Sequence, residues 1–315
     1  MAGEMVDYDE FAYFADNAAE FGIAYGGPPT VRRESLPMPD RRNLSALVWG
    51  EAEPELVLVH GGAQNAHTWD TVCLALGRPL IAVDMPGHGH SDAPADGVAN
   101  VGRNAQDLAV VIRALAPGAH TVVGMSLGGL TTMALSAHEP GLFETMFLVD
   151  VTPGVTNEKA KVIADFVNGP ESFDSLDDLL ARAIEFNPTR TESSLRRGIL
   201  HNAEQSEDGS WVWRHARHKV FGHNKTSDRV ASTASDNDES PNHEELWQAI
   251  EHHQGPVVLA RGMREESVVD DADEAELRRL RPDARIEQFV EAGHSIQGDM
   301  PVELAALIDE VAGRP

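Results

Sequence analysis

The stretch TVVGMSLGGLTTM, residues 121–133, places Ser126 between Gly124 and Gly128, with an apolar run on either side. Glycine has no Cβ, so glycines on both sides of one serine indicate a tight turn with the hydroxyl at its tip. The run before the serine is short and β-branched, which predicts a strand, and the apolar residues after it recur at helical spacing. Strand, tight turn and helix together form the nucleophile elbow that the G-x-S-x-G pattern describes. So short a pattern also arises by chance. A catalytic role for Ser126 therefore requires a base and an acid elsewhere in the chain.

The composition excludes several classes of partner. The 315 residues include 51 acidic and 25 basic side chains, a formal charge of −26, which repels nucleic acid and anionic membranes. No apolar run approaches the roughly 20 residues that span a bilayer, and the first residues lack the pattern of a signal peptide. We therefore expect a cytoplasmic protein that binds neither nucleic acid nor membrane. The single cysteine, Cys73, rules out an intrachain disulfide.

Short apolar runs alternate with helical patterns along most of the chain, which is the rhythm of βαβ units. The first two runs, 30–36 and 43–50, lie close together and predict a hairpin. We therefore expect an α/β fold with a mostly parallel eight-stranded sheet flanked by helices.

The alternation is interrupted once, after the sixth expected strand, by about a hundred residues that read mainly as helices. We expect this insertion to form a cap over the sheet edge where open α/β sheets bind ligands. The predicted plan is an N-terminal arm over 1–30, a core over 31–154 and 255–315, and a cap over 155–254. A polar stretch at 223–245, rich in Ser, Asp and Asn, is typical of mobile segments. The arm suits either an edge of the core or the partner subunit of a homodimer.

A serine hydroxyl is a weak nucleophile until a base takes its proton, and the base needs a third group to orient it. His294 follows the last expected strand and precedes the final helix, so it belongs on the same sheet edge as Ser126. Asp150 ends an apolar strand, where a carboxylate is costly to bury without a partner. Glu265 and Glu266, in a charged run after the next strand, are the alternatives for the acid.

Four motifs in order resemble those of the α/β-hydrolase superfamily: LVHGG at 58–62, VDMPGHGHSD at 83–92, GMSLGG at 124–129 and AGHSIQ at 292–297. The order serine, acid, histidine is also that of the superfamily. The resemblance implies that Ser126 is the nucleophile and His294 the general base and acid. Many members carry the acid after the seventh strand, where Glu265 stands, and some carry it after the sixth, where Asp150 stands, and we expect Asp150. It also implies an oxyanion hole made by the N–H groups of Gly62 and Leu127, and a reaction without a cofactor. The histidines of the cap lack acidic or Cys residues at ligand spacing, so we expect no metal site.

The substrate depends on the cap. We expect Trp211, Trp213 and His201 of the cap and Met125 beside the nucleophile to bind it, although such aromatic residues also form the cores of caps. The resemblance favours a cofactor-independent serine hydrolase of a carboxylic ester or lactone of a bulky apolar molecule, for example a resorcylic macrolactone of the zearalenone kind. A C–C bond hydrolase of the meta-cleavage type on the same triad and a non-catalytic ligand-binding member are the alternatives.

Overall fold

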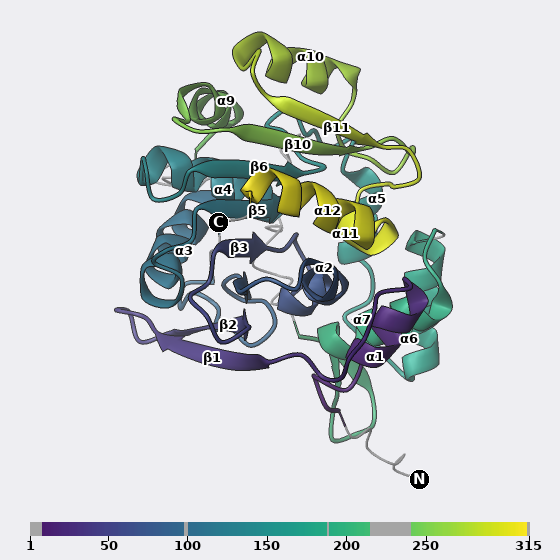
Figure 1. Ribbon diagram of the computed structural model, residues 1–315. Helices are drawn as coiled ribbons and strands as arrows, with labels where there is room; N and C mark the ends of the chain where they lie inside the picture. Colours follow the sequence, from purple (N-terminus) through teal and green to yellow (C-terminus); the bar gives the residue numbers. More distant parts are fainter. Residues whose placement is uncertain (1–7, 98–99, 188, 215–240, 314–315) are drawn as a thin grey trace.

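The computed structural model describes residues 8–97, 100–187, 189–214 and 241–313. Its centre is an eight-stranded sheet in the order β1-β2-β4-β3-β5-β6-β10-β11 (Figure 1). The strands are β1 (Val31–Pro37), β2 (Asn43–Trp49), β3 (Leu56–Val59), β4 (Leu80–Val83), β5 (Thr121–Met125), β6 (Thr145–Val149), β10 (Val257–Gly262) and β11 (Arg285–Phe289).

The sheet is antiparallel at one edge and parallel elsewhere. β1 and β2 form the predicted hairpin, and β2 also pairs with β4 in antiparallel register. The remaining neighbours, from β4 to β11, all pair in parallel. Every residue of β3, β4, β5 and β6 is buried, as expected for parallel strands covered on both faces. The predicted α/β fold with its eight-stranded sheet is confirmed.

Helices cover both faces and create two apolar cores. One core joins the sheet to α3 (Val101–Leu115), α4 (Leu127–His138), α9 (His243–His252) and α10 (Asp271–Leu280). The other joins it to α1 (Phe14–Glu20), the 3-10 helix η1 (Ala66–Trp69), α2 (Asp70–Leu76), α11 (Ile296–Asp299) and α12 (Pro301–Ala312). The result is a three-layer molecule whose loops at the carboxyl ends of the parallel strands are left to build a site.

Between β6 and β10 the chain forms a small unit with its own core. It contains α5 (Lys161–Val167), β7 (Ser172–Phe173), α6 (Leu176–Phe186), α7 (Glu192–Asn202), β8 (Ala203–Gln205) and β9 (Trp211–Trp213). The three short strands pair as β7-β9-β8. Leu179, Ile199 and Trp211 are among the buried residues at its centre.

The expected cap range of 155–254 is too long at its carboxyl end. Helix α9 packs on α4, and its Leu246 and Ile250 are buried in the core under the sheet. Apolar spacing predicts that a helix has a buried face but not which layer that face meets. Most of the polar stretch 223–245 lies outside the described residues.

The N-terminal arm lies against both the core and the cap. Phe14 of α1 is buried in the core beside Trp49, with ring centroids 5.1 Å apart. On the cap side, Arg197 of α7 donates a hydrogen bond of 2.7 Å to Asn17 and pairs with Glu20. Figure 1 shows α1 beside α7. The arm therefore joins the two parts of the molecule.

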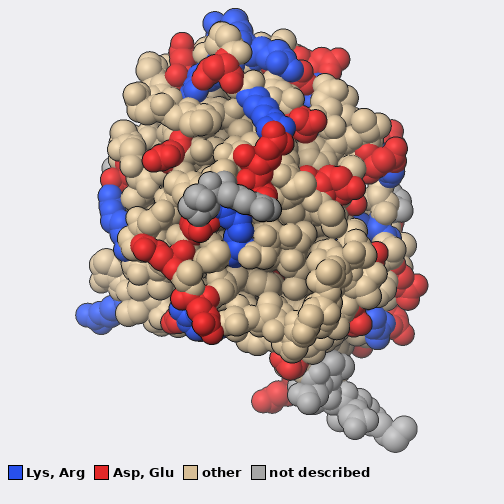
Figure 2. All heavy atoms as spheres, viewed as in Figure 1, with Lys and Arg blue, Asp and Glu red and all other residues tan. Residues whose placement is uncertain are grey.

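The surface carries mixed charge. On the face shown in Figure 2, Lys and Arg side chains lie singly or next to Asp and Glu. In the described residues, no helix has both the length and the apolar character needed to cross a membrane.

Candidate active site

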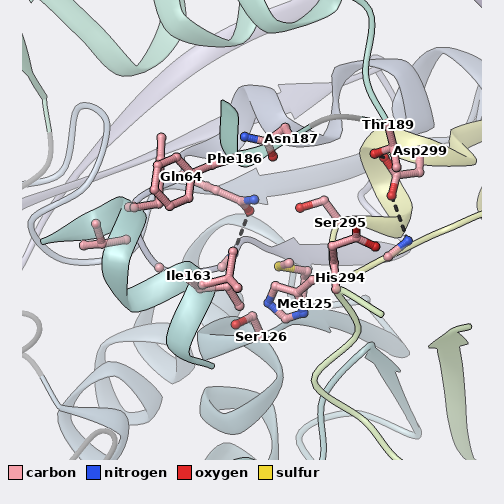
Figure 3. Close-up of a pocket in the computed structure, with 18 of the residues that line it drawn as sticks. Gln64, Met125, Ser126, Ile163, Phe186, Asn187, Thr189, His294, Ser295 and Asp299 are labelled. Carbon is pink, nitrogen blue, oxygen red and sulfur yellow. Dashed lines mark hydrogen bonds between the residues drawn. The ribbon is translucent and has the colours of Figure 1, made fainter. Parts of the chain in front are cut away.

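Ser126 stands in the turn between β5 and α4 with φ 50° and ψ −119°. A positive φ is strained for a residue with a side chain, and such strain is concentrated at functional sites. The turn directs the serine into a pocket that His294 also lines (Figure 3).

The glycines around Ser126 permit a close approach of backbone to backbone. A Cβ at Gly128 would lie 2.3 Å from the carbonyl oxygen of Val59, and one at Gly124 would lie 2.5 Å from that of Gly128. Contacts this short are not possible, so only glycine lets α4 begin directly over β3. The sequence pattern GMSLGG is therefore a packing requirement of the turn.

Asp150 lies directly after β6, fully buried, with φ 46°. Its Oδ2 is 2.9 Å from Nδ1 of His294. Its carboxylate also accepts hydrogen bonds from Gly262 N at 2.9 Å, Ser267 Oγ at 2.6 Å and Val268 N at 3.1 Å. Four donors to one buried carboxylate fix its orientation toward the His294 ring. With Nδ1 donating to Asp150, Nε2 of His294 is the atom free to accept a proton.

The alternative acids, Glu265 and Glu266, line the pocket instead of bonding to the His294 ring. Glu265 is exposed, and Oε2 of Glu266 is buried without a hydrogen-bond partner among the described residues. The geometry thus favours Asp150 over both.

The loop after β3 carries the expected oxyanion donor Gly62, which lines the pocket. Its neighbour Gly61 lies so close to the nucleophile that a Cβ there would be 2.5 Å from the Met125 sulfur and 3.2 Å from Ser126 Cβ. Gln64 accepts a hydrogen bond of 3.1 Å from Gly61 N (Figure 3). The second expected donor, Leu127, is the first residue of α4, and the first N–H groups of a helix have no acceptor within it.

His60, which precedes the two glycines, holds this loop in place through two hydrogen bonds. Its Nε2 accepts a hydrogen bond of 3.0 Å from Met85 N, and its Nδ1 donates to Gly61 O at 2.7 Å. The residue is fully buried, and burial lowers its pKa to about 3. His60 is therefore neutral and braces the loop.

The pocket encloses a cavity of about 160 Å³. Its apolar wall comes from helices α5 and α6, through Val162, Ile163, Phe166, Val167 and Phe186. Polar groups of Gln64, Asn187 and Asp299 lie on its lining (Figure 3). The cavity is smaller than the roughly 300–1,000 Å³ of drug-sized ligand sites.

Of the expected substrate-binding residues, Met125 lines the pocket, but Trp211, Trp213 and His201 are not among the described residues that do. Trp211 is buried in the core of the cap, with Trp213 packed against it. His201 is buried between Tyr8 and His67. The expectation for these three was wrong because an aromatic residue predicts burial but not which side of the cap it faces.

Two residues that support the site could not be predicted from the sequence. Ser267 donates to Asp150, and Asp299 accepts a hydrogen bond of 2.9 Å from Gly293 N, next to His294 (Figure 3). Asp299 also accepts from Thr189 of the cap at 3.0 Å. Such contacts depend on how separate loops meet in space.

Comparisons with known proteins agree with this fold. The sequence model of the alpha/beta hydrolase family matches residues 56–307. Esterase Rv0045c of Mycobacterium tuberculosis is 40% identical over 98% of this chain and 97% of its own. A solved structure of that esterase, from work on its inhibition by transition metals, has a TM-score of 0.79 with 37% identity and covers 97% of this chain and 99% of its own. The fold is also that of E-2-(acetamidomethylene)succinate hydrolase, with a TM-score of 0.72, 22% identity and coverage of 88% and 97%. The chain belongs to the alpha/beta hydrolase family.

Proposed function

We propose that this protein is a serine esterase that hydrolyses small carboxylic esters through an acyl-enzyme. The hydrogen bond between His294 Nδ1 and the buried Asp150 carries the proposal, because it orients a base in the same pocket as the strained Ser126. The near full-length similarity to an esterase supports the choice of ester over other acyl substrates.

In the first half of the reaction, Nε2 of His294 takes the proton of Ser126 as its Oγ attacks the ester carbonyl. The N–H groups of Gly62 and Leu127 hold the negative oxygen of the tetrahedral intermediate, at the positive end of α4. His294 then gives the proton to the departing alcohol, which leaves the acyl group on Ser126.

In the second half, His294 takes a proton from a water molecule that attacks the acyl-enzyme, and returns it to Ser126 Oγ as the acid leaves. Asp150 stays ionised throughout and stabilises the imidazolium.

The cavity selects for small acyl groups. Its 160 Å³ is close to the volume of an engineered protein cavity of about 150 Å³ that binds benzene. A bulky lactone of the zearalenone kind therefore requires the cap to open, and short-chain or aryl esters fit the pocket as it stands.

A fluorophosphonate probe and a series of p-nitrophenyl esters from acetate to dodecanoate test the proposal. We expect one probe per chain on Ser126, and higher kcat/KM for short than for long esters. The Ser126→Ala variant is the matched control for both readouts. Failure of the probe to label the wild type would favour the non-catalytic alternative, and turnover of a dienone acid but no ester would favour C–C bond hydrolysis.

No step of this mechanism passes through a metal. We therefore expect kcat for a short ester to be unchanged after dialysis against EDTA. Loss of activity on chelation, restored by added Zn²⁺, would contradict the mechanism.

A further inference from the structure

A second cluster of titratable side chains lies where the core, the cap and the arm meet. His67 of η1 and Asp70 at the start of α2 belong to the core, and His201 stands in the last turn of α7. All three are buried, and one donor atom from each lies within 4.8 Å of the other two. None is among the described residues that line the catalytic pocket.

Two polar atoms in this cluster have no partner in the described part of the chain. They are Oδ1 of Asp70 and Nε2 of His201, on side chains that are 2% and 5% exposed. His201 Nε2 is 3.9 Å from Asp70 Oδ2, too far for a hydrogen bond. Buried polar atoms are normally paired, so these two atoms on facing residues point to a missing ligand.

The far side of each imidazole is already held. Nε2 of His67 is 3.0 Å from Glu10 Oε2. On the other ring, Nδ1 of His201 is 2.7 Å from the hydroxyl of Tyr8. Metal-binding histidines commonly bond their second nitrogen to a carboxylate or another polar partner, which fixes the ring. The arm supplies this partner for both rings.

The charge of the surrounding network calls for a cation. The carboxylates of Glu10, Asp70 and Asp84 are linked in it. Arg33, which bonds to Glu10 and Asp84, is the one guanidinium hydrogen-bonded to these carboxylates in the described residues. In the described residues these three carboxylates therefore share one bonded guanidinium, an excess of acidic over basic side chains.

We propose that His67, Asp70 and His201 form a binding site for a late first-row divalent cation such as Zn²⁺, separate from the catalytic pocket. Two imidazoles and a carboxylate are a donor set that suits Zn²⁺ and Ni²⁺ better than Mg²⁺. The ion replaces the hydrogen bond between His67 Nδ1 and Asp70 Oδ2, which are 2.9 Å apart.

Coordination requires a small rearrangement. Tetrahedral Zn²⁺ holds its donor atoms roughly 3.4 Å apart, so the cluster contracts. The rings of His67 and His201 are now stacked, with centroids 4.0 Å apart and planes at 11°, and they must tilt for their lone pairs to converge. Once bound, the ion ties α7 of the cap to the core.

Equilibrium dialysis of the tag-free full chain against ZnCl2, with metal analysis, tests the site. We expect one Zn²⁺ per chain, competition by NiCl2 and none by MgCl2. His201→Phe keeps a ring stacked on His67, and Asp70→Asn keeps the side-chain shape. Each should weaken Zn²⁺ binding at least about a hundredfold, beyond the typical cost of losing an outer partner.

Two further variants make the test specific. Tyr8→Phe should weaken binding about tenfold or more, because it removes the outer partner of His201. His252→Ala, which removes an exposed histidine at the end of α9, should bind like the wild type. Thermal melting and ester hydrolysis in EDTA show that each variant is folded. Absence of Zn²⁺ binding in the wild type, or unchanged binding in folded His201→Phe and Asp70→Asn, would overturn the proposal, as would loss of binding in His252→Ala.

Discussion

Ser126 occupies a strained backbone conformation that a folded chain keeps only where the surrounding structure enforces it. Because serine and histidine act as a unit, Ser126→Ala and His294→Ala should each lower kcat by about a thousandfold or more. Steady-state kinetics on a short ester measure the loss, and thermal melting shows whether the fold is intact. Near wild-type turnover by either folded variant would refute the assigned roles.

Replacing Asp150 by asparagine tests the acid separately. All four hydrogen-bond partners of its carboxylate are donors, and an amide offers them one oxygen in place of two. Asp150→Asn presents an NH2 group to these donors and favours the wrong tautomer of His294. We expect kcat at neutral pH to fall by about three to four orders of magnitude.

Glu265→Gln and Glu266→Gln are the matched controls for Asp150→Asn. They should keep most of the activity, because neither carboxylate bonds to the His294 ring. A large loss in either of them, with Asp150→Asn nearly active, would move the triad acid to the loop after β10.

Most residues of the triad could be predicted from the sequence. The end of an apolar strand pointed to Asp150 because a buried carboxylate needs a partner. Nothing local indicated Ser267, whose hydroxyl reaches Asp150 only because the loop after β10 folds back over β6.

Among the elements, α5 and α6 set the size of the pocket. Phe166 of α5 and Phe186 of α6 have ring centroids 5.4 Å apart, and the Arg182 guanidinium lies over both. Arg182 also donates to the carbonyl oxygens of Asp165 at 2.8 Å and Phe166 at 3.0 Å, at the end of α5. The aromatic wall is thus held in place by contacts outside the pocket.

Phe166→Ala should therefore lengthen the accepted acyl chain. Each buried CH2 contributes about 0.8 kcal/mol, so the ratio of kcat/KM for octanoate over butanoate should rise about tenfold or more. Val302→Ala, on α12 away from the pocket, is the control that should leave the ratio unchanged. An unchanged ratio in folded Phe166→Ala would mean that acyl chains bind elsewhere.

Element positions were easier to predict than their contacts. Apolar or alternating runs located all eight strands of the sheet. Strands β3 to β6 are buried on both faces and are therefore short and continuously apolar, whereas the edge strands β1 and β11 are only partly buried. The same reasoning assigned α9 to the cap and Trp211 to the pocket, because periodicity reports that a face is buried and not what covers it.

For the molecule as a whole, buried neutral histidines predict acid lability. The pKa of His60 is lowered by burial to about 3, against about 6.5 in the unfolded chain, so the unfolded state binds more protons between these values. The contribution of His60 to the free energy of unfolding is fully present above pH 6.5 and is lost as the pH falls towards 3. Burial also lowers the pKa values of His88, His90 and His253, which act in the same direction.

We expect the free energy of unfolding to drop by several kcal/mol between pH 7 and pH 4, at about 1.4 kcal/mol per pKa unit. Urea titrations across this range, with EDTA present, measure the drop. His60→Gln can still accept from Met85 N but does not titrate, so its profile should be flatter. Equal slopes for the wild type and this variant would assign the lability to other groups.

The crowding of the glycines around Ser126 also has a consequence for directed evolution. At positions 124 and 128 the backbone leaves no space for a Cβ, so libraries that randomise these two positions would consist almost entirely of inactive clones. Of the wall residues, Val162 is exposed and lies in neither apolar core, whereas Ile163 packs against the core that contains α3 and α4, so Val162 is the wall position most tolerant of exchange. A laboratory seeking new ester substrates should diversify the wall and leave the elbow untouched.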